Sequence, residues 1–249
     1  MFTACKKESK TVYQDEDIEV TTSIYPEAIT NVFEAHGGID QWNQFNGLQF
    51  GIQRDDFVES HEVNLKSRQS LIKYKHHHLG FDGEQVWVKN LDTTTYKSNP
   101  KFYYNLMFYF YTMPFIVADN GIIYEEGPDL VVDGKTYPGI LISYEAGVGE
   151  SPEDEYVIYY DEETNRMEWL AYTVTFFSKE KGKKFNLIKY SDWQSLDGLL
   201  MPTKLQWHKF EDGEVGDMRN ELVFINTTFS KESPNSNLFV VPEGATIAE

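Results

Sequence analysis

The sequence predicts a mainly β fold with few helices (α+β), in which an antiparallel meander forms an unclosed β-barrel or curved sheet. An aromatic plug helix is expected on the concave face of this sheet. Many short segments alternate apolar and polar residues with a period of two, which is typical of half-buried strands. Four Asp-Gly pairs separate such segments. One segment, 102–113, is apolar on nearly all sides and breaks the period.

Composition sets the class of protein. The 249 residues include 15% aromatic side chains, which bury large apolar areas and suit pleated strands. The formal net charge of −18 repels phosphate groups, so we expect no nucleic-acid partner. The single cysteine excludes an internal disulfide and a cysteine-rich zinc module.

The first residues resemble the end of a bacterial lipoprotein signal. Small residues at Thr3 and Ala4 stand directly before Cys5, the residue that would carry the lipid. The alternative is an incidental or buried cysteine. The polar segment that follows reads as a flexible tether. We therefore predict a tether over 1–18 and a single β domain over 19–249.

Two helices are expected before the strands. Pro26 suits a first helical turn, Ile29 and Phe33 fall at helical spacing, and Gly37-Gly38 supplies the stop. A short helical turn over 39–45 should then place Trp42 on the core.

The strand candidates follow the second helical turn and continue to the end of the chain. Asp82-Gly83, Asp133-Gly134, Asp197-Gly198 and Asp212-Gly213 tolerate the positive φ angles of tight hairpins, so successive strands should be antiparallel. The predicted strands are 48–52, 62–66, 70–77, 85–89, 93–97, 129–132, 140–145, 156–160, 167–177, 185–193, 203–210 and 220–228.

The segment 102–113 is predicted to be one helix. Asn99 can cap it, Pro100 can occupy its first position, and Pro114 ends or kinks it. Twelve residues rise roughly 18 Å, too little to span a bilayer, so a helix apolar all round must be buried across a curved sheet. Two adjacent strands are the alternative, because Tyr and Phe also favour sheets.

Several short motifs resemble one known group of proteins. The segment 80–88, with Asp82-Gly83 and Trp87, resembles a hairpin of the LolA/LolB-like periplasmic lipoprotein carriers. The segments 198–202 and 239–245 resemble their late strand and terminal edge, and the segment 34–38 with Trp42 resembles an uncharacterised family of Bacteroidota lipoproteins. The resemblance implies an unclosed barrel with a helical plug, entered by hydrophobic or acylated ligands.

Motifs for catalysis or metal binding are weak. In a strand, only His76 and His78 of the run 76–78 face the same side, and a metal would need a further ligand. The alternative is a polar strand end before a turn. His36 before Gly37-Gly38 reads as a helix end more readily than as a site. We find no nucleophile elbow, phosphate loop or dinucleotide motif, and we predict no catalytic residue, metal or cofactor.

The function expected is a lipoprotein of the bacterial cell envelope, lipid-anchored and facing the periplasm or the cell surface, that holds a hydrophobic or acylated ligand. Its partners would be a lipid or acyl chain and, through Cys5, a membrane. One alternative is a structural or interaction lipoprotein with a filled core, and a weaker one is a hydrolase or metal-binding protein using His76 and His78. The candidate ligand-binding residues are Trp87, Phe108, Tyr109, Tyr111, Met113, Phe115, Tyr172 and Trp207.

Overall fold

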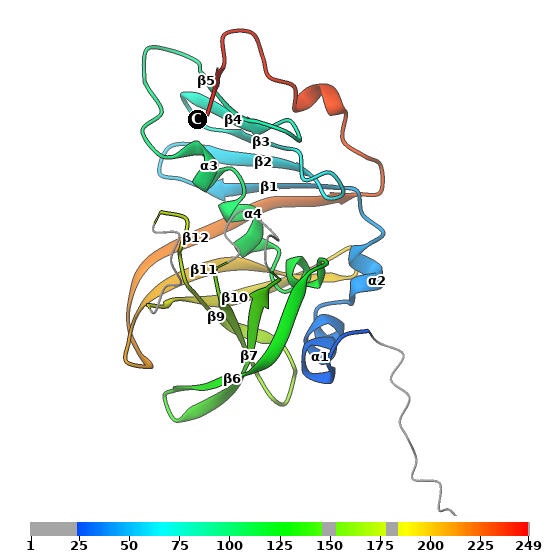
Figure 1. The fold of residues 1–249 in the computed structure, drawn as a ribbon, viewed down its shortest axis with the longest axis vertical. Coiled ribbons are helices and arrows are strands. Elements are labelled where there is room, and N and C mark those ends of the chain that lie inside the picture. Colours follow the sequence, from blue (N-terminus) through cyan, green and yellow to red (C-terminus); the bar gives the residue numbers. More distant parts are fainter. Residues whose placement is uncertain (1–23, 146–152, 178–183, 249) are drawn as a thin grey trace, which may run out of the picture.

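The strands form one open antiparallel sheet (Figure 1). A computed structural model describes residues 24–145, 153–177 and 184–248. The 13 strands lie in the order β13-β5-β4-β3-β2-β1-β12-β11-β10-β9-β8-β7-β6. Nearly all neighbours in the sheet are also neighbours in the sequence, except that β1 pairs with β12 and β13 returns to β5. The predicted antiparallel meander and unclosed curved sheet are confirmed.

The strands vary from two to 17 residues. They are β1 (Gly47–Gln53), β2 (Val58–Asn64), β3 (Ser70–Lys73), β4 (His77–Phe81), β5 (Val86–Asn90), β6 (Ile122–Val132), β7 (Lys135–Tyr144), β8 (Tyr156–Tyr160), β9 (Met167–Tyr172), β10 (Asn186–Leu196), β11 (Leu199–Glu211), β12 (Glu214–Ser230) and β13 (Thr246–Ile247). The helices are α1 (Glu27–Ala35), α2 (Ile39–Trp42), α3 (Pro100–Tyr103), α4 (Leu106–Tyr111), and the 3-10 helices η1 (Phe115–Ala118) and η2 (Ser236–Leu238).

The Asp-Gly pairs form hairpin turns as predicted. At three of them, which join β6 to β7, β10 to β11 and β11 to β12, both residues have positive φ angles. These angles match the right-handed twist of paired strands. Asp82-Gly83 turns between β4 and β5, with only Gly83 at positive φ.

Three strand predictions needed correction. The predicted strand 70–77 is a hairpin, in which β3 ends at Lys73 and the antiparallel β4 begins at His77. The segment 93–97 is not a strand, because all its side chains except that of Tyr96 are exposed and no described strand pairs with it. The edge strand β6 begins at Ile122, well before the predicted 129, because its first half carries consecutive acidic residues that hide the period of two.

The two N-terminal helices lie as predicted. α1 buries Ile29, Val32 and Phe33, and α2 buries Trp42, which stacks on Phe115 with ring centroids 5.0 Å apart. These contacts place both helices against the same core as the aromatic segment.

The aromatic segment is helical, but it is not the single helix that was predicted. It forms α3, α4 and η1 in succession, and the Asn99 side chain accepts a hydrogen bond from the Phe102 amide to cap α3. The break at Tyr104 lets the two helices pack on different parts of the sheet. Tyr104 packs with Ile72 and the hairpin β4–β5, whereas α4 packs into the main core.

The main core lies between the helices and the concave face of the sheet. It contains buried side chains of α1, α2, α4 and η1 and of the strands β1, β2 and β7 to β12. Figure 1 shows α4 lying across the middle of the sheet, with α1 and α2 beside β6 and β7. The plug therefore occupies the concave face, as expected.

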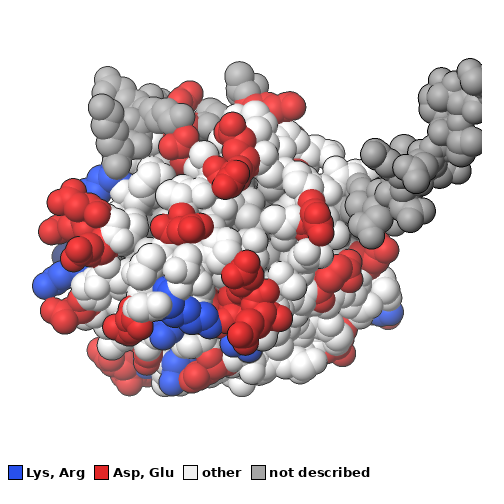
Figure 2. Space-filling view, turned by 90° about the horizontal axis from the view of Figure 1, so that it is seen from below, with Lys and Arg blue, Asp and Glu red and all other residues white. Residues whose placement is uncertain are grey.

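The surface is strongly acidic, with 40 Asp and Glu against 22 Lys and Arg. Figure 2 shows acidic side chains spread over one face of the molecule, with fewer basic ones among them. Among the described residues, no helix has the length and apolar character needed to cross a membrane.

Candidate ligand-binding pocket

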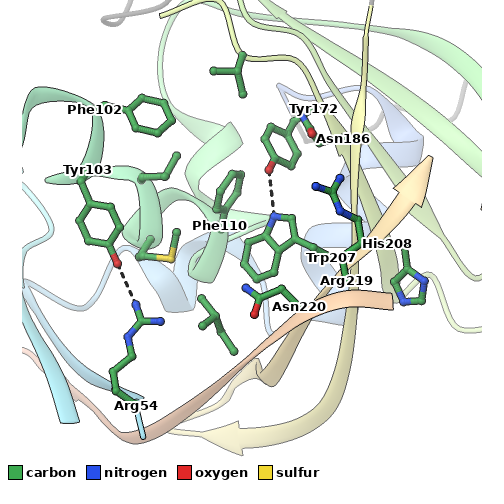
Figure 3. Close-up of a pocket in the computed structure, with 14 residues that line it drawn as sticks. Arg54, Phe102, Tyr103, Phe110, Tyr172, Asn186, Trp207, His208, Arg219 and Asn220 are labelled. Carbon is green, nitrogen blue, oxygen red and sulfur yellow. Dashed lines mark hydrogen bonds between the residues drawn. The ribbon is translucent and has the colours of Figure 1, made fainter. Parts of the chain in front are cut away.

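A pocket of about 500 Å³ opens between the plug helices and strands β9 to β12 (Figure 3). This volume lies within the roughly 300–1,000 Å³ of small-molecule sites. The lining residues come from both layers and are Arg54, Phe102, Tyr103, Leu106, Met107, Phe110, Tyr172, Val174, Asn186, Trp207, His208, Arg219, Asn220 and Leu222.

The plug contributes one apolar stripe to this pocket. Phe102, Leu106 and Phe110 follow each other at intervals of four residues, so they fall on one side of a helical segment. Phe108 and Tyr111 are buried in the main core and Tyr104 is buried against the β4–β5 hairpin, so none of the three lines the pocket. The plug therefore separates a filled core from an open pocket.

Aromatic side chains continue from the pocket to the surface. Phe102 contacts Phe176 and Phe177, with ring centroids 5.4 and 5.0 Å away. Phe177 is 68% exposed, an unusual position for a large apolar side chain that contacts two others. The mouth of the pocket is therefore apolar on the side of α3.

Tyr172 and Trp207 form the polar contact in the sheet wall. The Trp207 Nε1–H donates to the Tyr172 hydroxyl at 3.0 Å. Burial raises the pKa of Tyr172, although Trp207 and the positive charge of Arg219 act to lower it. The hydroxyl is therefore protonated and keeps its own hydrogen for another acceptor.

A buried carboxylate, that of Glu59, binds the arginine that lines the opposite end of the pocket. Glu59 is fully buried and accepts hydrogen bonds from Arg54 at 2.6 Å, His61 at 2.8 Å and Tyr103 at 2.7 Å. Burial alone would raise the pKa of Glu59, but these partners outweigh it and leave the pKa lowered. Arg54 is thereby neutralised where it lines the pocket.

The structure brings two of the predicted binding residues, Tyr172 and Trp207, to the pocket. Four others are fully buried in the main core and do not line it, namely Phe108, Tyr111, Met113 and Phe115. Tyr111, for example, stacks on Phe224 at 4.2 Å, and its hydroxyl lies 2.5 Å from that of Thr227. Tyr109 packs on the edge of the same core.

Trp87 lies away from the pocket, on the other face of the sheet. Successive residues of β5 face opposite sides, and Val86 packs toward Tyr104 while Trp87 packs with Leu71 and Phe239. Its Nε1–H donates to the Phe239 carbonyl at 3.0 Å. Cys5 lies outside the described residues, so its lipidation stays a prediction.

The histidine run makes ordinary polar contacts. His76 pairs with Asp92 at 2.6 Å, and His77 lies 3.1 Å from the Asn90 side chain. In the part of the chain that the structure describes, no three His, Cys, Asp or Glu side chains cluster as a metal site would require.

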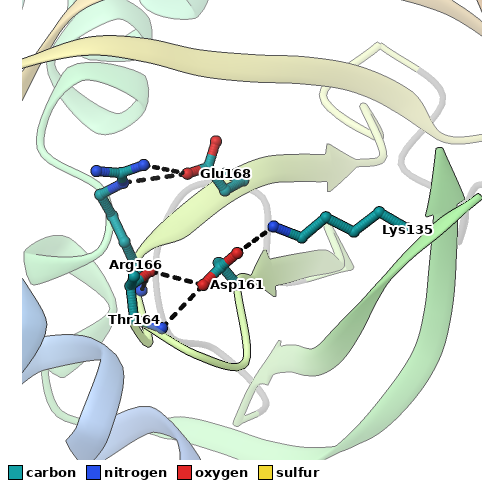
Figure 4. A network of polar contacts seen from close by, with 5 residues as sticks. All are labelled: Lys135, Asp161, Thr164, Arg166 and Glu168. Carbon is teal, nitrogen blue, oxygen red and sulfur yellow. Dashed lines mark hydrogen bonds and ion pairs between the residues drawn. The ribbon is translucent and has the colours of Figure 1, made fainter. Parts of the chain in front are cut away.

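The acidic run after β8 is a structural turn (Figure 4). Asp161 accepts hydrogen bonds from the amide and hydroxyl of Thr164, both at 2.8 Å, and pairs with Lys135 of β7. The contact with Lys135 and those with Thr164 lower the pKa of Asp161 to about 2. Arg166 pairs with Glu168 at 2.7 Å. These side chains join the β8–β9 turn to the neighbouring hairpin.

Sequence reasoning missed the polar side chains that line the pocket. Arg54, Asn186, Arg219 and Asn220 stand at strand ends or on a long strand where charged residues usually face solvent. Helical spacing puts Phe102, Leu106 and Phe110 on one side of the aromatic segment, but the segment is apolar all round, so spacing does not show that this side faces the pocket.

No protein-family model matches the sequence, and no curated protein matches it. Several solved structures are similar in fold. A LolA superfamily protein from Nitrosomonas europaea has 9% identity and a TM-score of 0.44, over 78% of this chain and 88% of that one. A DUF1329 family protein from Desulfovibrio piger has 13% identity and a TM-score of 0.43, over 77% and 88%.

A third similar structure is a domain from Vibrio parahaemolyticus whose name refers to the sorting of outer membrane lipoproteins. It has 7% identity and a TM-score of 0.40, over 82% of this chain and 96% of that one. The first of these structures bears the name of the superfamily that the sequence motifs resemble. The narrower resemblance to a Bacteroidota lipoprotein family stays a prediction.

Proposed function

We propose that this protein is a cell-envelope lipoprotein that binds a hydrophobic or acylated ligand in the pocket beneath α3 and α4, without covalent chemistry. The pocket itself carries the proposal. It has about 500 Å³ of space, an apolar stripe from the plug on one side and Tyr172 and Trp207 on the other. Apolar walls with a few polar groups are the usual lining of a small-molecule site.

Burial of apolar surface would drive binding. Each methylene removed from water contributes about 0.8 kcal/mol, which is close to a four-fold change in affinity. We therefore expect affinity to rise about four-fold per methylene from decanol to tetradecanol, measured by quenching of tryptophan fluorescence. A flat series would contradict a chain-binding pocket.

Lipid extraction from the purified protein, followed by mass spectrometry, tests the proposal directly. We expect an apolar or acylated compound to copurify with the protein. Val174 lines the pocket and is half-buried, so Val174→Trp should fill the space and remove that compound. Val223 makes a matched control, because it is also half-buried but does not line the pocket, whereas its neighbour Leu222 does.

Val223→Trp should keep the compound. If both variants lost the compound equally, the tryptophan would act by destabilising the fold. Thermal unfolding followed by circular dichroism would detect such a loss of stability. A wild-type protein without any bound compound, and without affinity for the alcohols, would refute ligand binding.

The membrane anchor is a separate part of the proposal. The residues before Cys5 support lipidation of that cysteine, and the lipid would hold the protein in the bacterial envelope. Metabolic labelling with a palmitate analogue in the cells that make the protein should label it, and Cys5→Ser should remove the label. Labelling that persists in Cys5→Ser would contradict the anchor.

A structural or interaction lipoprotein is the second candidate. The fully buried side chains of Phe108, Tyr111, Met113 and Phe115 favour it, because the side of the plug that faces the main core is filled. This candidate predicts that no lipid copurifies with the wild-type protein, and that Val174→Trp gives the same result as the wild type. The same extraction therefore distinguishes the two functions.

A further inference from the structure

A β-bulge places two consecutive residues of β12 in the pocket wall. Trp207 pairs with Asn220 and His208 pairs with Met218, so Arg219 is an extra residue without a partner opposite it. In a regular strand, Arg219 and Asn220 would face opposite sides of the sheet. Because of the bulge, both line the pocket. Bulges are frequent next to functional sites, where they redirect a side chain.

Arg219 lies at the end of the pocket where β9 and β10 meet. Figure 3 shows it in the same wall as Tyr172 and Asn186, which pair directly across these two strands. Its charge acts on the Tyr172 hydroxyl. We call Tyr172, Asn186 and Arg219 the donor corner of the pocket.

The donor corner has hydrogens to donate, and the described residues offer no acceptor that receives them. The Tyr172 hydroxyl already accepts from Trp207, so its own hydrogen points to another acceptor. Among the described residues, Arg219 makes no ion pair, and neither Asn186 nor Arg219 makes a side-chain hydrogen bond. An acceptor with several oxygen atoms would satisfy all three groups.

Arg54, at the other end of the pocket, provides the contrast. Its Nε and Nη2 donate to Glu59 and its Nη2 also donates to Tyr103, so its charge is compensated by a carboxylate within the protein. A chain with net charge −18 has carboxylates in excess, yet none pairs with Arg219 in the described structure. The two ends of the pocket therefore differ in charge: Arg54 is paired with Glu59, whereas Arg219 has no carboxylate partner among the described residues.

We propose that the donor corner binds the anionic head group of an amphiphile, a carboxylate or a phosphate monoester, while its apolar chain lies along Phe102, Leu106 and Phe110. This inference rests on the proposed function and names the ligand class. The planar guanidinium of Arg219 matches two oxygens of either head group, and Tyr172 and Asn186 donate to the remaining lone pairs.

The test compares ligands that share a chain and differ in the head group. Dodecanoate, dodecyl phosphate and the neutral methyl dodecanoate are titrated below their aggregation limits into wild-type protein, and inorganic phosphate is titrated alone. We expect both anionic amphiphiles to bind at least about ten-fold more tightly than the ester, as hydrogen bonds to a charged group imply. Inorganic phosphate alone should bind far more weakly than dodecyl phosphate.

Arg219→Gln should remove the preference, so that the anionic amphiphiles and the ester bind the variant with about equal affinity. Lys209→Gln is the matched control, because it removes one positive charge from the adjacent strand β11 outside the pocket and should keep the preference. A preference that survives in Arg219→Gln would overturn the assignment to the donor corner.

The outcomes separate this inference from the proposed function. If ester and acid bind equally well, the pocket binds chains and the inference about the head group is wrong. If inorganic phosphate binds as tightly as dodecyl phosphate, the site is for a free anion and the amphiphile is wrong. If no amphiphile binds at all, the proposed function itself fails.

Discussion

His36 ends α1 in a fully buried position between Trp193 and Phe115, with ring centroids 4.9 and 6.4 Å away. Its Nδ1–H donates to the Val32 carbonyl at 2.7 Å, while Nε2 has no partner among the described residues. Burial lowers the pKa of His36 to about 4, against the effect of the bond to Val32. The imidazole is therefore neutral in the folded protein at neutral pH.

This histidine should make the protein sensitive to mild acid. Between its unfolded pKa of 6.5 and its folded pKa of about 4, only the unfolded chain takes up the proton. Stability is thus fully present above pH 6.5 and is lost as the pH falls toward 4, by roughly 3 kcal/mol. Urea unfolding across this range measures the loss, and His36→Phe should show a shallower dependence on pH. Identical slopes in both proteins would contradict the prediction.

Glu59 gives a second prediction at the scale of one residue. Removing its charge leaves Arg54 and His61 without their buried partner, and breaking a buried ion pair costs about 3–5 kcal/mol. Chemical denaturation should show that loss for Glu59→Gln. Glu62→Gln, on the same strand but only half-buried, should change stability by less than about 0.5 kcal/mol.

At the scale of elements, the junction of α1 and α2 packs directly on the β10–β11 turn. The Leu200 amide donates to the His36 carbonyl at 2.9 Å, and the Gln41 side chain donates to the Asp197 carbonyl at 2.6 Å. Gly37 has φ of +106°, and a Cβ there would lie 2.1 Å from the Gly198 carbonyl oxygen. Only glycine fits both the angle and the contact.

Gly37→Ala should therefore separate the helices from the turn. We expect a loss of about 2 kcal/mol or more in the free energy of unfolding, from backbone strain together with the clash. Gly213→Ala is the control, since Gly213 has φ of +82° with nothing within 4 Å, and it should lose only about 1 kcal/mol. Equal losses would mean that the clash contributes nothing.

The aromatic plug shows how far an element can be predicted from sequence. The Asn99 cap and the burial of the segment were predicted correctly, because both depend on local residue types. The break at Tyr104 was not, because it follows from where the hairpin β4–β5 lies relative to the main core. No pattern within 102–113 contains that information.

At the scale of the whole molecule, the net charge of −18 lowers the stability of the folded state. Like charges repel one another across the folded surface, and salt screens that repulsion. Raising the ionic strength from about 0.01 M to about 0.15 M shortens the screening length from about 30 Å to about 8 Å, so Tm should rise. Differential scanning calorimetry in a sodium chloride series measures it. A fall in Tm would show that attractive ion pairs dominate over net repulsion.

The pocket was only partly predictable from the sequence. Of the residues proposed from the sequence, Tyr172 and Trp207 line the pocket, since both stand on apolar faces of predicted strands. Phe108 and Tyr111 were placed in the site but lie in the core, because a segment that is apolar all round does not reveal which side faces the space. Arg219 was missed, because a bulge depends on the register of two strands and leaves no mark in residue types.

The antiparallel meander, the hairpin turns and the presence of a buried aromatic segment all follow from local sequence patterns. Alternation, Asp-Gly pairs and capping residues act over a few neighbouring positions, so they can be recognised without knowing the fold. Local patterns do not show which side of the plug is filled and which is open, or that Arg219 lines the pocket; both are seen in the folded chain. Those features arise where β9 to β12 meet α3 and α4, and contacts between segments so far apart depend on strand register and packing.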